Sequence, residues 1–172
     1  MEIQATEYLD VAKRAEELGL NVPTGLAILP NNFDTATSAD ELIHEGTTPT
    51  IRSLWRQSGV IETRLEKDGS KLPQSAKKSA DWISPIIFVS QAMLTNAALP
   101  LTINLISSYL YDLLKGRHGK TQVAIRFVSE RSEKTQNGQN KKSMLLTFKG
   151  TPQEWKDFDV DKVRQLLEGK NN

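Results

Sequence analysis

The chain has no cysteine among its 172 residues. This absence excludes disulfide bonds, thiolate metal sites and a cysteine nucleophile, although it does not fix the cellular compartment. The first residues, MEIQATEYLD, lack both the basic region and the apolar stretch of a secretory signal. We therefore expect a cytoplasmic protein.

An excess of charge of either sign is also missing. Lysine and arginine total 22 against 21 for aspartate and glutamate, which gives a net charge of +1. A dedicated duplex-DNA binder is usually more basic, so the composition argues against a nucleic-acid partner. The length suits one domain, or one domain with an attached subdomain, that buries a sizeable core.

Residues 82–111 contain no charged side chain, in a chain that is 25% charged. A segment this apolar must be buried in a core, in a partner or in a membrane. A membrane-spanning helix needs about 20 predominantly apolar residues. Polar side chains and prolines interrupt the run, and Pro100 divides it. We therefore expect two buried helices, over residues 86–99 and 101–114, with a membrane insertion as the alternative.

The region before this run is polar and broken by turn residues. Thr6 is a candidate N-cap for a short amphipathic helix over residues 6–18. Residues 26–29 form an apolar run between proline and glycine, which suits a buried strand or an extended segment. Capping patterns predict short helices over residues 39–45 and 48–57. Residues 1–80 are thus expected to be a mainly helical region beside a unit of residues 81–172.

The C-terminal third alternates apolar and polar residues over 121–130 and returns over 143–149, with a turn at Asn137-Gly138. This pattern predicts an antiparallel β-hairpin. A capping box begins at Thr151, and Asp159 is placed to cap a final amphipathic helix. The expected fold class is α+β: long buried apolar helices, a C-terminal antiparallel β-hairpin plus helix, and a mainly helical N-terminal part.

The order of these parts carries a resemblance. The apolar run ISPIIFVSQAMLTNAALPLTINLISSYLYDLLKG is followed by TQVAIRFVSE, SMLLTFKG and DVDKVRQLLEG. Over residues 82–169 this order resembles the small effector-associated components of bacterial conflict and anti-phage systems. The resemblance implies a protein that links sensors or effectors to one another rather than a catalyst. It does not extend to residues 24–80 and carries over no site residue.

Candidate chemical groups are sparse. Asp40 and His44 are four residues apart on a predicted helix, and Arg52 and Arg56 form a basic pair on the next one. These residues could orient a base or hold an anion, although a solvated, capped helix explains them more simply. The ligand set is too small for a metal site, so we expect neither a metal nor a cofactor.

Basic residues also gather at the predicted hairpin tip, where they could contact phosphates: Arg131, Lys134, Lys141 and Lys142. No aromatic residue lies between them to stack on bases, so a solvated tip is the simpler interpretation.

The leading functional hypothesis is a non-enzymatic interaction or assembly component of bacterial type. It would self-associate or dock a protein partner through residues 82–114, with five candidate anchors: Trp82, Ile86, Phe88, Leu105 and Tyr109. The alternatives are a membrane-active effector that inserts the same run, and a small enzyme or anion-binding module that uses the polar region 31–56.

Overall fold

The computed structural model describes residues 1–67, 72–76, 81–115 and 121–170. The strands are β1 (Glu2–Tyr8), β2 (Leu26–Leu29), β3 (Trp82–Val89), β4 (Val123–Thr135) and β5 (Gly138–Gly150). The helices are α1 (Val11–Glu17), α2 (Thr48–Gln57), α3 (Ala98–Leu114), α4 (Pro152–Lys156) and α5 (Val160–Leu167), with 3-10 turns η1 (Ala39–Glu41) and η2 (Gln91–Thr95).

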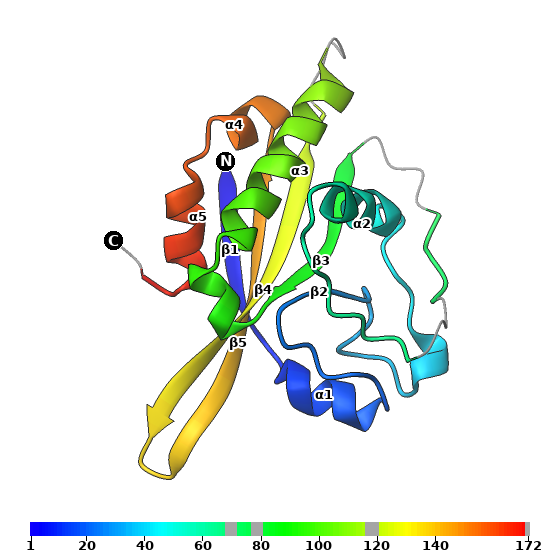
Figure 1. The fold of residues 1–172 in the computed structure, drawn as a ribbon, viewed down its shortest axis with the longest axis vertical. Coiled ribbons are helices and arrows are strands. Elements are labelled where there is room, and N and C mark those ends of the chain that lie inside the picture. The colour runs from blue at the N-terminus through cyan, green and yellow to red at the C-terminus, as the bar shows by residue number, and fades with distance from the viewer. Residues whose placement is uncertain (68–71, 77–80, 116–120, 171–172) are drawn as a thin grey trace.

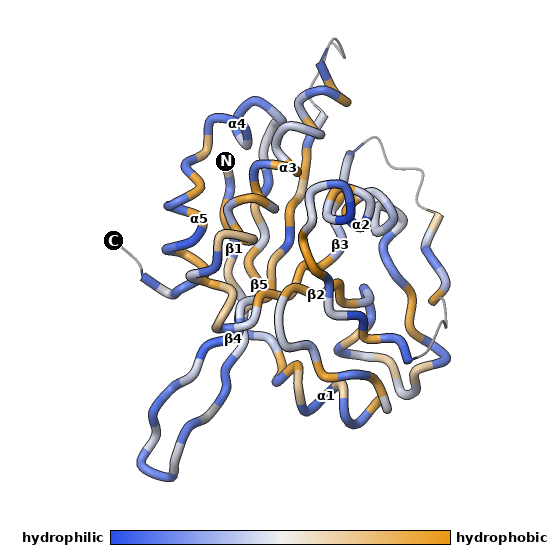
Figure 2. The backbone as a smooth tube through the Cα atoms, in the orientation of Figure 1, coloured by the Kyte–Doolittle hydropathy of each residue, from blue (hydrophilic) through white to orange (hydrophobic). Residues whose placement is uncertain are grey.

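The centre of the fold is a five-stranded sheet in the order β1-β5-β4-β3-β2 (Figure 1). β3 and β4 run parallel and are joined by α3, whereas every other neighbouring pair is antiparallel. The β4–β5 hairpin is longer than its neighbours and projects beyond the sheet. Apolar residues concentrate in the middle strands, and polar ones at the hairpin tip (Figure 2).

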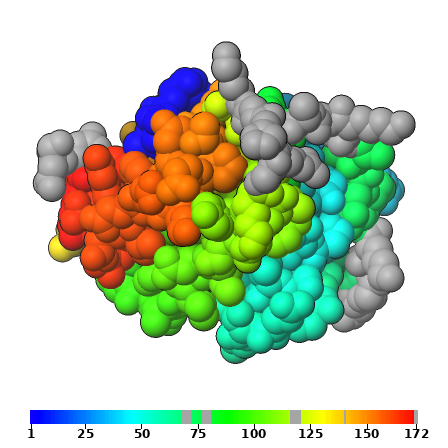
Figure 3. Space-filling model, turned by 90° about the horizontal axis from the view of Figure 1, so that it is seen from above, coloured from blue at the N-terminus to red at the C-terminus, as the bar shows by residue number. Residues whose placement is uncertain are grey.

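Each face of the sheet carries its own hydrophobic core. Ile87 and Val89 of β3 pack on one face, against α2, α3, α4 and α5. Ile86 and Phe88 point to the other face, where α1 and the segment after β2 cover them. The helices of the first face lie side by side when the molecule is seen from above (Figure 3). We call these two layers the helical face and the α1 face.

The predicted fold class is wrong, because the centre of the molecule is a mixed sheet and not a pair of long helices. The first eight residues of the uncharged run form β3, which is buried on both faces. A strand covered on both sides reads as a continuous apolar run, and periodicity alone does not distinguish it from a buried helix. The predicted helix over 101–114 does exist, as part of α3.

The N-terminal region is also not mainly helical. β1 takes the place of the first part of the helix predicted over 6–18, and α1 starts after Asp10, whose carboxylate accepts a hydrogen bond from the Lys13 amide at 3.2 Å. The helix predicted over 39–45 is only the 3-10 turn η1. β2 and α2 lie where the sequence predicts them. β1 and β2 join the three later strands in one sheet.

The predicted C-terminal elements are present. Thr151 and Glu154 form the capping box of α4, and Asp159 caps α5. In the described part of the chain, no helix combines the length and apolarity needed to cross a membrane.

Candidate functional site

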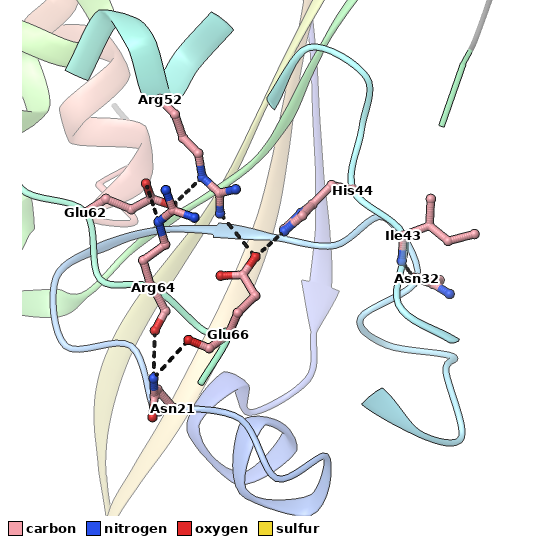
Figure 4. Close-up of polar contacts among 8 residues, drawn as sticks. All are labelled: Asn21, Asn32, Ile43, His44, Arg52, Glu62, Arg64 and Glu66. Atoms are coloured by element: carbon pink, nitrogen blue, oxygen red, sulfur yellow. Dashed lines mark hydrogen bonds and ion pairs between the residues drawn. The ribbon is translucent and has the colours of Figure 1, made fainter. Parts of the chain in front are cut away.

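The most concentrated group of charged side chains inside the protein is an ionic cluster of His44, Arg52, Glu62 and Glu66 (Figure 4). The Oε1 atom of Glu66 lies 2.7 Å from Nε2 of His44 and 3.3 Å from Nη2 of Arg52. Nε of Arg52 donates to Oε1 of Glu62 at 2.8 Å. One carboxylate thus joins a histidine and an arginine, and the arginine joins a second carboxylate.

Three separate segments bring these groups together. Arg52 comes from α2, His44 from the extended segment before it, and the two glutamates from residues 62–66. That last segment is held beside β2 by a hydrogen bond from the Thr63 amide to the Leu26 carbonyl at 2.7 Å. Asn21 fixes its far end, because the amide of Asn21 donates to the Leu65 carbonyl at 2.9 Å. The cluster therefore links three segments of the N-terminal region to one another beside β2.

The protonation state of Glu66 is set by competing effects. Burial alone disfavours the carboxylate and raises its pKa. Hydrogen bonds from His44 and from the backbone amide of Glu66 itself, together with the positive charge of Arg52, outweigh burial and lower the pKa of Glu66 from 4.5 to about 2. Glu66 is therefore ionised throughout the physiological pH range.

The His44–Glu66 pair at the centre of the cluster is closed to solvent. The side chain of His44 is 1% exposed and that of Glu66 is 3% exposed. A general acid or base must lie within hydrogen-bond distance of its substrate, and the burial of both side chains prevents such an approach. Nδ1 of His44 and Oε2 of Glu66 are buried without a hydrogen-bond partner. The arrangement suits a structural role, in which the cluster holds the three segments together, better than a catalytic one.

The structure separates the four residues that the sequence singled out. His44 and Arg52 meet through Glu66, but Asp40 and Arg56 are exposed and outside the cluster. Asp40 and His44 do not share a helix, because η1 ends at Glu41 and Leu42 is extended. Sequence reasoning missed Glu66 because it lies far from the predicted helices and in no motif. Among the described residues, no group of three acidic or histidine side chains is placed to hold a metal ion.

A second polar site surrounds Arg126 on the α1 face. The register of β3 against β4 shifts between Ile83 and Ile86, where Pro85 offers no amide hydrogen. Arg126 fills this gap. Its amide donates to Oγ of Ser84 at 2.9 Å, and its Nε donates to the Ser84 carbonyl at 3.0 Å. Glu45 lies 3.4 Å from the same guanidinium. Arg126 therefore provides hydrogen bonds across the bulge between β3 and β4, and its guanidinium is not free to bind an anion.

The basic residues of the hairpin are mostly engaged within the protein. Arg131 donates to the carbonyls of Leu166 and Leu167 at the end of α5. Lys142 pairs with Glu7 at 2.9 Å, and Lys141 lies 4.0 Å from Glu130. Lys134 is exposed near the tip. These four residues do not form a single basic surface.

The five predicted anchors divide into two groups. Trp82, Ile86 and Phe88 belong to β3 and are buried in the two cores. Leu105 and Tyr109 are half-buried on α3, and the ring of Tyr109 lies 6.3 Å from that of Trp82. Burial of the first three in the folded chain leaves them no surface for a partner.

Exposed apolar side chains gather instead at the start of α3. Ile61 is 85% exposed and Leu101 is 39% exposed. Both line a pocket of about 500 Å³, which we call the Ile61 pocket. Its other lining residues are uncharged: Thr24, Gly25, Leu26, Gly59, Val60, Thr63, Met93, Asn96, Ala97 and Ala98. Sequence reasoning missed Ile61 because the sequence does not show whether an apolar side chain in a polar segment is buried or exposed.

The Ile61 pocket is not an anion site, although it lies at a helix N-terminus. The side-chain oxygen of Asn96 already accepts a hydrogen bond from the Ala98 amide at 2.9 Å. The Leu99 amide donates to the Asn96 carbonyl, and Pro100 has no amide hydrogen. The first turn of α3 therefore presents apolar side chains and not amide donors.

Comparison of the chain with protein-family models, with curated proteins and with solved structures found no match.

Glu66 makes the stability of the protein depend on acidity. Its pKa is lower in the folded protein than in the unfolded chain, so its contribution is complete above about pH 4.5 and is lost as the pH falls towards about 2. We expect the difference in unfolding free energy between the wild type and Glu66→Gln to shrink steadily over this interval. Urea titrations at a series of pH values measure it. A difference that does not change with pH contradicts the assignment.

Proposed function

We propose that the protein is a non-enzymatic interaction component that binds an apolar segment of a protein partner in the Ile61 pocket. The observation that carries the proposal is the exposure of Ile61 and Leu101 beside an uncharged pocket. Complete burial of an isoleucine or leucine side chain contributes about 1.5–3 kcal/mol. Two such side chains left in contact with water are a ready source of binding free energy.

The chemistry of the pocket supports binding rather than catalysis. Its lining contains hydroxyl, amide and apolar side chains but no ionisable one. The candidate acid–base pair of the protein, His44 and Glu66, lies elsewhere and is buried. General acid–base or nucleophilic catalysis needs an ionisable group or an activated nucleophile in reach of the substrate. The pocket therefore suits the side chains of a partner better than a reacting substrate.

The charges next to the pocket favour one kind of partner. Arg56 is exposed at the end of α2, just before the lining residue Gly59, and Arg64 directly follows the lining residue Thr63. The side chain of Arg64 is half exposed, but its Nε lies 3.6 Å from Oε2 of Glu62. Arg56 is therefore the cation available to a partner here, and an apolar segment with an acidic residue beside it would complement both the pocket and Arg56.

This proposal retains the assembly role that the sequence predicts, but it moves the docking surface. The contact includes residues 93–101 of the uncharged run together with residues 59–63, and it excludes the buried strand β3. A cytoplasmic location and a bacterial-type role as a linking component remain part of the proposal. Binding is expected to need no metal and no cofactor.

Selection from a random-peptide phage library on the immobilised wild-type protein tests the proposal. The selected peptides should be rich in leucine, isoleucine and aromatic residues, with acidic neighbours. Ile61→Asp and Leu101→Asp should each weaken binding of a selected peptide by at least about tenfold, because each removes apolar contact and introduces a charge. Both side chains are exposed, so both variants should fold.

Leu113→Asp is the matched control, because Leu113 is 40% exposed at the opposite end of α3 and does not line the pocket. It should bind the selected peptides as the wild type does. Peptides that bind Ile61→Asp and the wild type equally well would overturn the proposal, as would a selection that enriches no common pattern.

A further inference from the structure

We infer that two copies of the chain associate by antiparallel pairing of their β1 strands, which joins the two sheets into one. This inference rests on β1 alone and does not depend on the Ile61 pocket. It names a second surface and a specific occupant, a further copy of this chain.

β1 is an edge strand that the described chain leaves open. It stands at the end of the strand order and pairs only with β5. The opposite edge of the sheet differs, because residues 62–63 run alongside β2. Leu26 forms a bridge with Glu62 and accepts a hydrogen bond from the Thr63 amide. Among the described residues, no segment gives β1 a comparable cover.

The open edge has few of the features by which sheets avoid edge-to-edge pairing. Such protection comes from proline, bulges or charged side chains, lysine above all. The charged residues of β1, Glu2 and Glu7, lie only at or next to its two ends. β1 pairs with β5 in an unbroken register from Glu2 opposite Lys149 to Tyr8 opposite Ser143. It contains no proline and no lysine, and its centre, Ile-Gln-Ala-Thr, is uncharged. Gln4, Ala5 and Thr6 are exposed.

Symmetry makes a second copy a suitable occupant. In an antiparallel pair related by a two-fold axis, residues directly opposite each other point to the same face of the joined sheet. Alternate residues of β1 share a face. An even-numbered residue therefore lies opposite an even-numbered one. Glu2 and Glu7 point to different faces, so the two-fold pairing never places one directly opposite the other.

The two glutamates of β1 also meet no like charge when the strands pair. Glu7 is paired with Lys142 of β5 at 2.9 Å, and this contact raises the pKa of Lys142. In a register centred on Ala5, Ala5 faces its own symmetry mate, Gln4 faces Thr6, and Glu2 faces Tyr8. All of these pairs are free of like-charge repulsion.

Sedimentation over a range of concentrations tests the inference with a charge swap at Ala5. The wild type should form a dimer. Ala5→Lys and Ala5→Glu should each weaken dimerisation by about fivefold or more, because each places like charges next to the two-fold axis. An equimolar mixture of the two variants should recover a dimer at least as stable as that of the wild type. Circular dichroism checks that each variant folds.

The control is the same pair of substitutions at Gln139, which is exposed at the hairpin tip beyond the end of β1. These variants should dimerise as the wild type does. A wild type that remains a monomer at every concentration overturns the inference. So does an Ala5→Lys variant that dimerises normally, or a mixture that dimerises no better than the separate variants. Ile61→Asp should not change the dimer, so this test can fail independently of the proposed function.

Discussion

Replacing Phe148 by alanine should lower the free energy of unfolding by about 3–5 kcal/mol. Phe148 is fully buried near the C-terminal end of β5, on the helical face. Its ring centroid lies 6.2 Å from that of Phe127, 5.5 Å from Trp155 and 6.0 Å from Phe158. The substitution removes the contacts of Phe148 with these three aromatic rings and leaves a cavity between the sheet and α4. Urea or guanidinium titration measures the loss.

Leu113→Ala is the control for this substitution. Leu113 is partly exposed on α3, so its truncation should change the unfolding free energy by no more than about 0.5 kcal/mol. A loss below about 1 kcal/mol for Phe148→Ala would show that this aromatic cluster does not hold α4 on the sheet.

Replacing Glu66 by alanine should cost about 3 kcal/mol of stability at neutral pH. The substitution leaves His44 without a partner on Nε2 in a site that water does not reach. It also leaves Nη2 of Arg52 without its carboxylate, although Nε of Arg52 keeps Glu62. Removal of one member of a buried ion pair is costly because the other member stays desolvated.

Arg56→Ala is the matched control on α2, because Arg56 is charged, one turn from Arg52, and exposed. Its effect on the unfolding free energy should stay within about 0.5 kcal/mol. Peptide binding at the Ile61 pocket should survive Glu66→Ala under conditions where the variant is folded. Equal stability of the Glu66 and Arg56 variants would contradict the conclusion that the ionic cluster holds the three segments together.

Local patterns predicted the elements that depend on local interactions. The alternation over 121–130 and the capping box at Thr151 gave the β4–β5 hairpin and the start of α4, because both involve neighbours in sequence. β1 could not be recognised in this way. Its residues are mostly exposed, so they lack the apolar alternation of a strand with one buried face. β1 forms through pairing with β5, almost the full length of the chain away.

The uncharged run shows a different limit. Its apolar character correctly predicted burial, but burial on both faces removes the periodicity that separates a strand from a helix. Within the helix and turn expected there, Pro85 instead lies at a bulge of β3, where the amide of Arg126 bonds to Ser84. For the ionic cluster, the sequence singled out His44 and Arg52 but not Glu66, which joins them through tertiary contacts. The exposure of Ile61 could not be predicted, since it is a property of the fold.

Amide chemical-shift mapping of a selected peptide on the labelled full-length chain tests the docking account most directly. We predict that the largest shift changes fall on residues 59–63 and 93–101, and that Ile61→Asp abolishes them while Leu113→Asp does not. Shift changes that cluster around His44 and Glu66, or along β1, would contradict the proposal that the Ile61 pocket is the binding site for a partner.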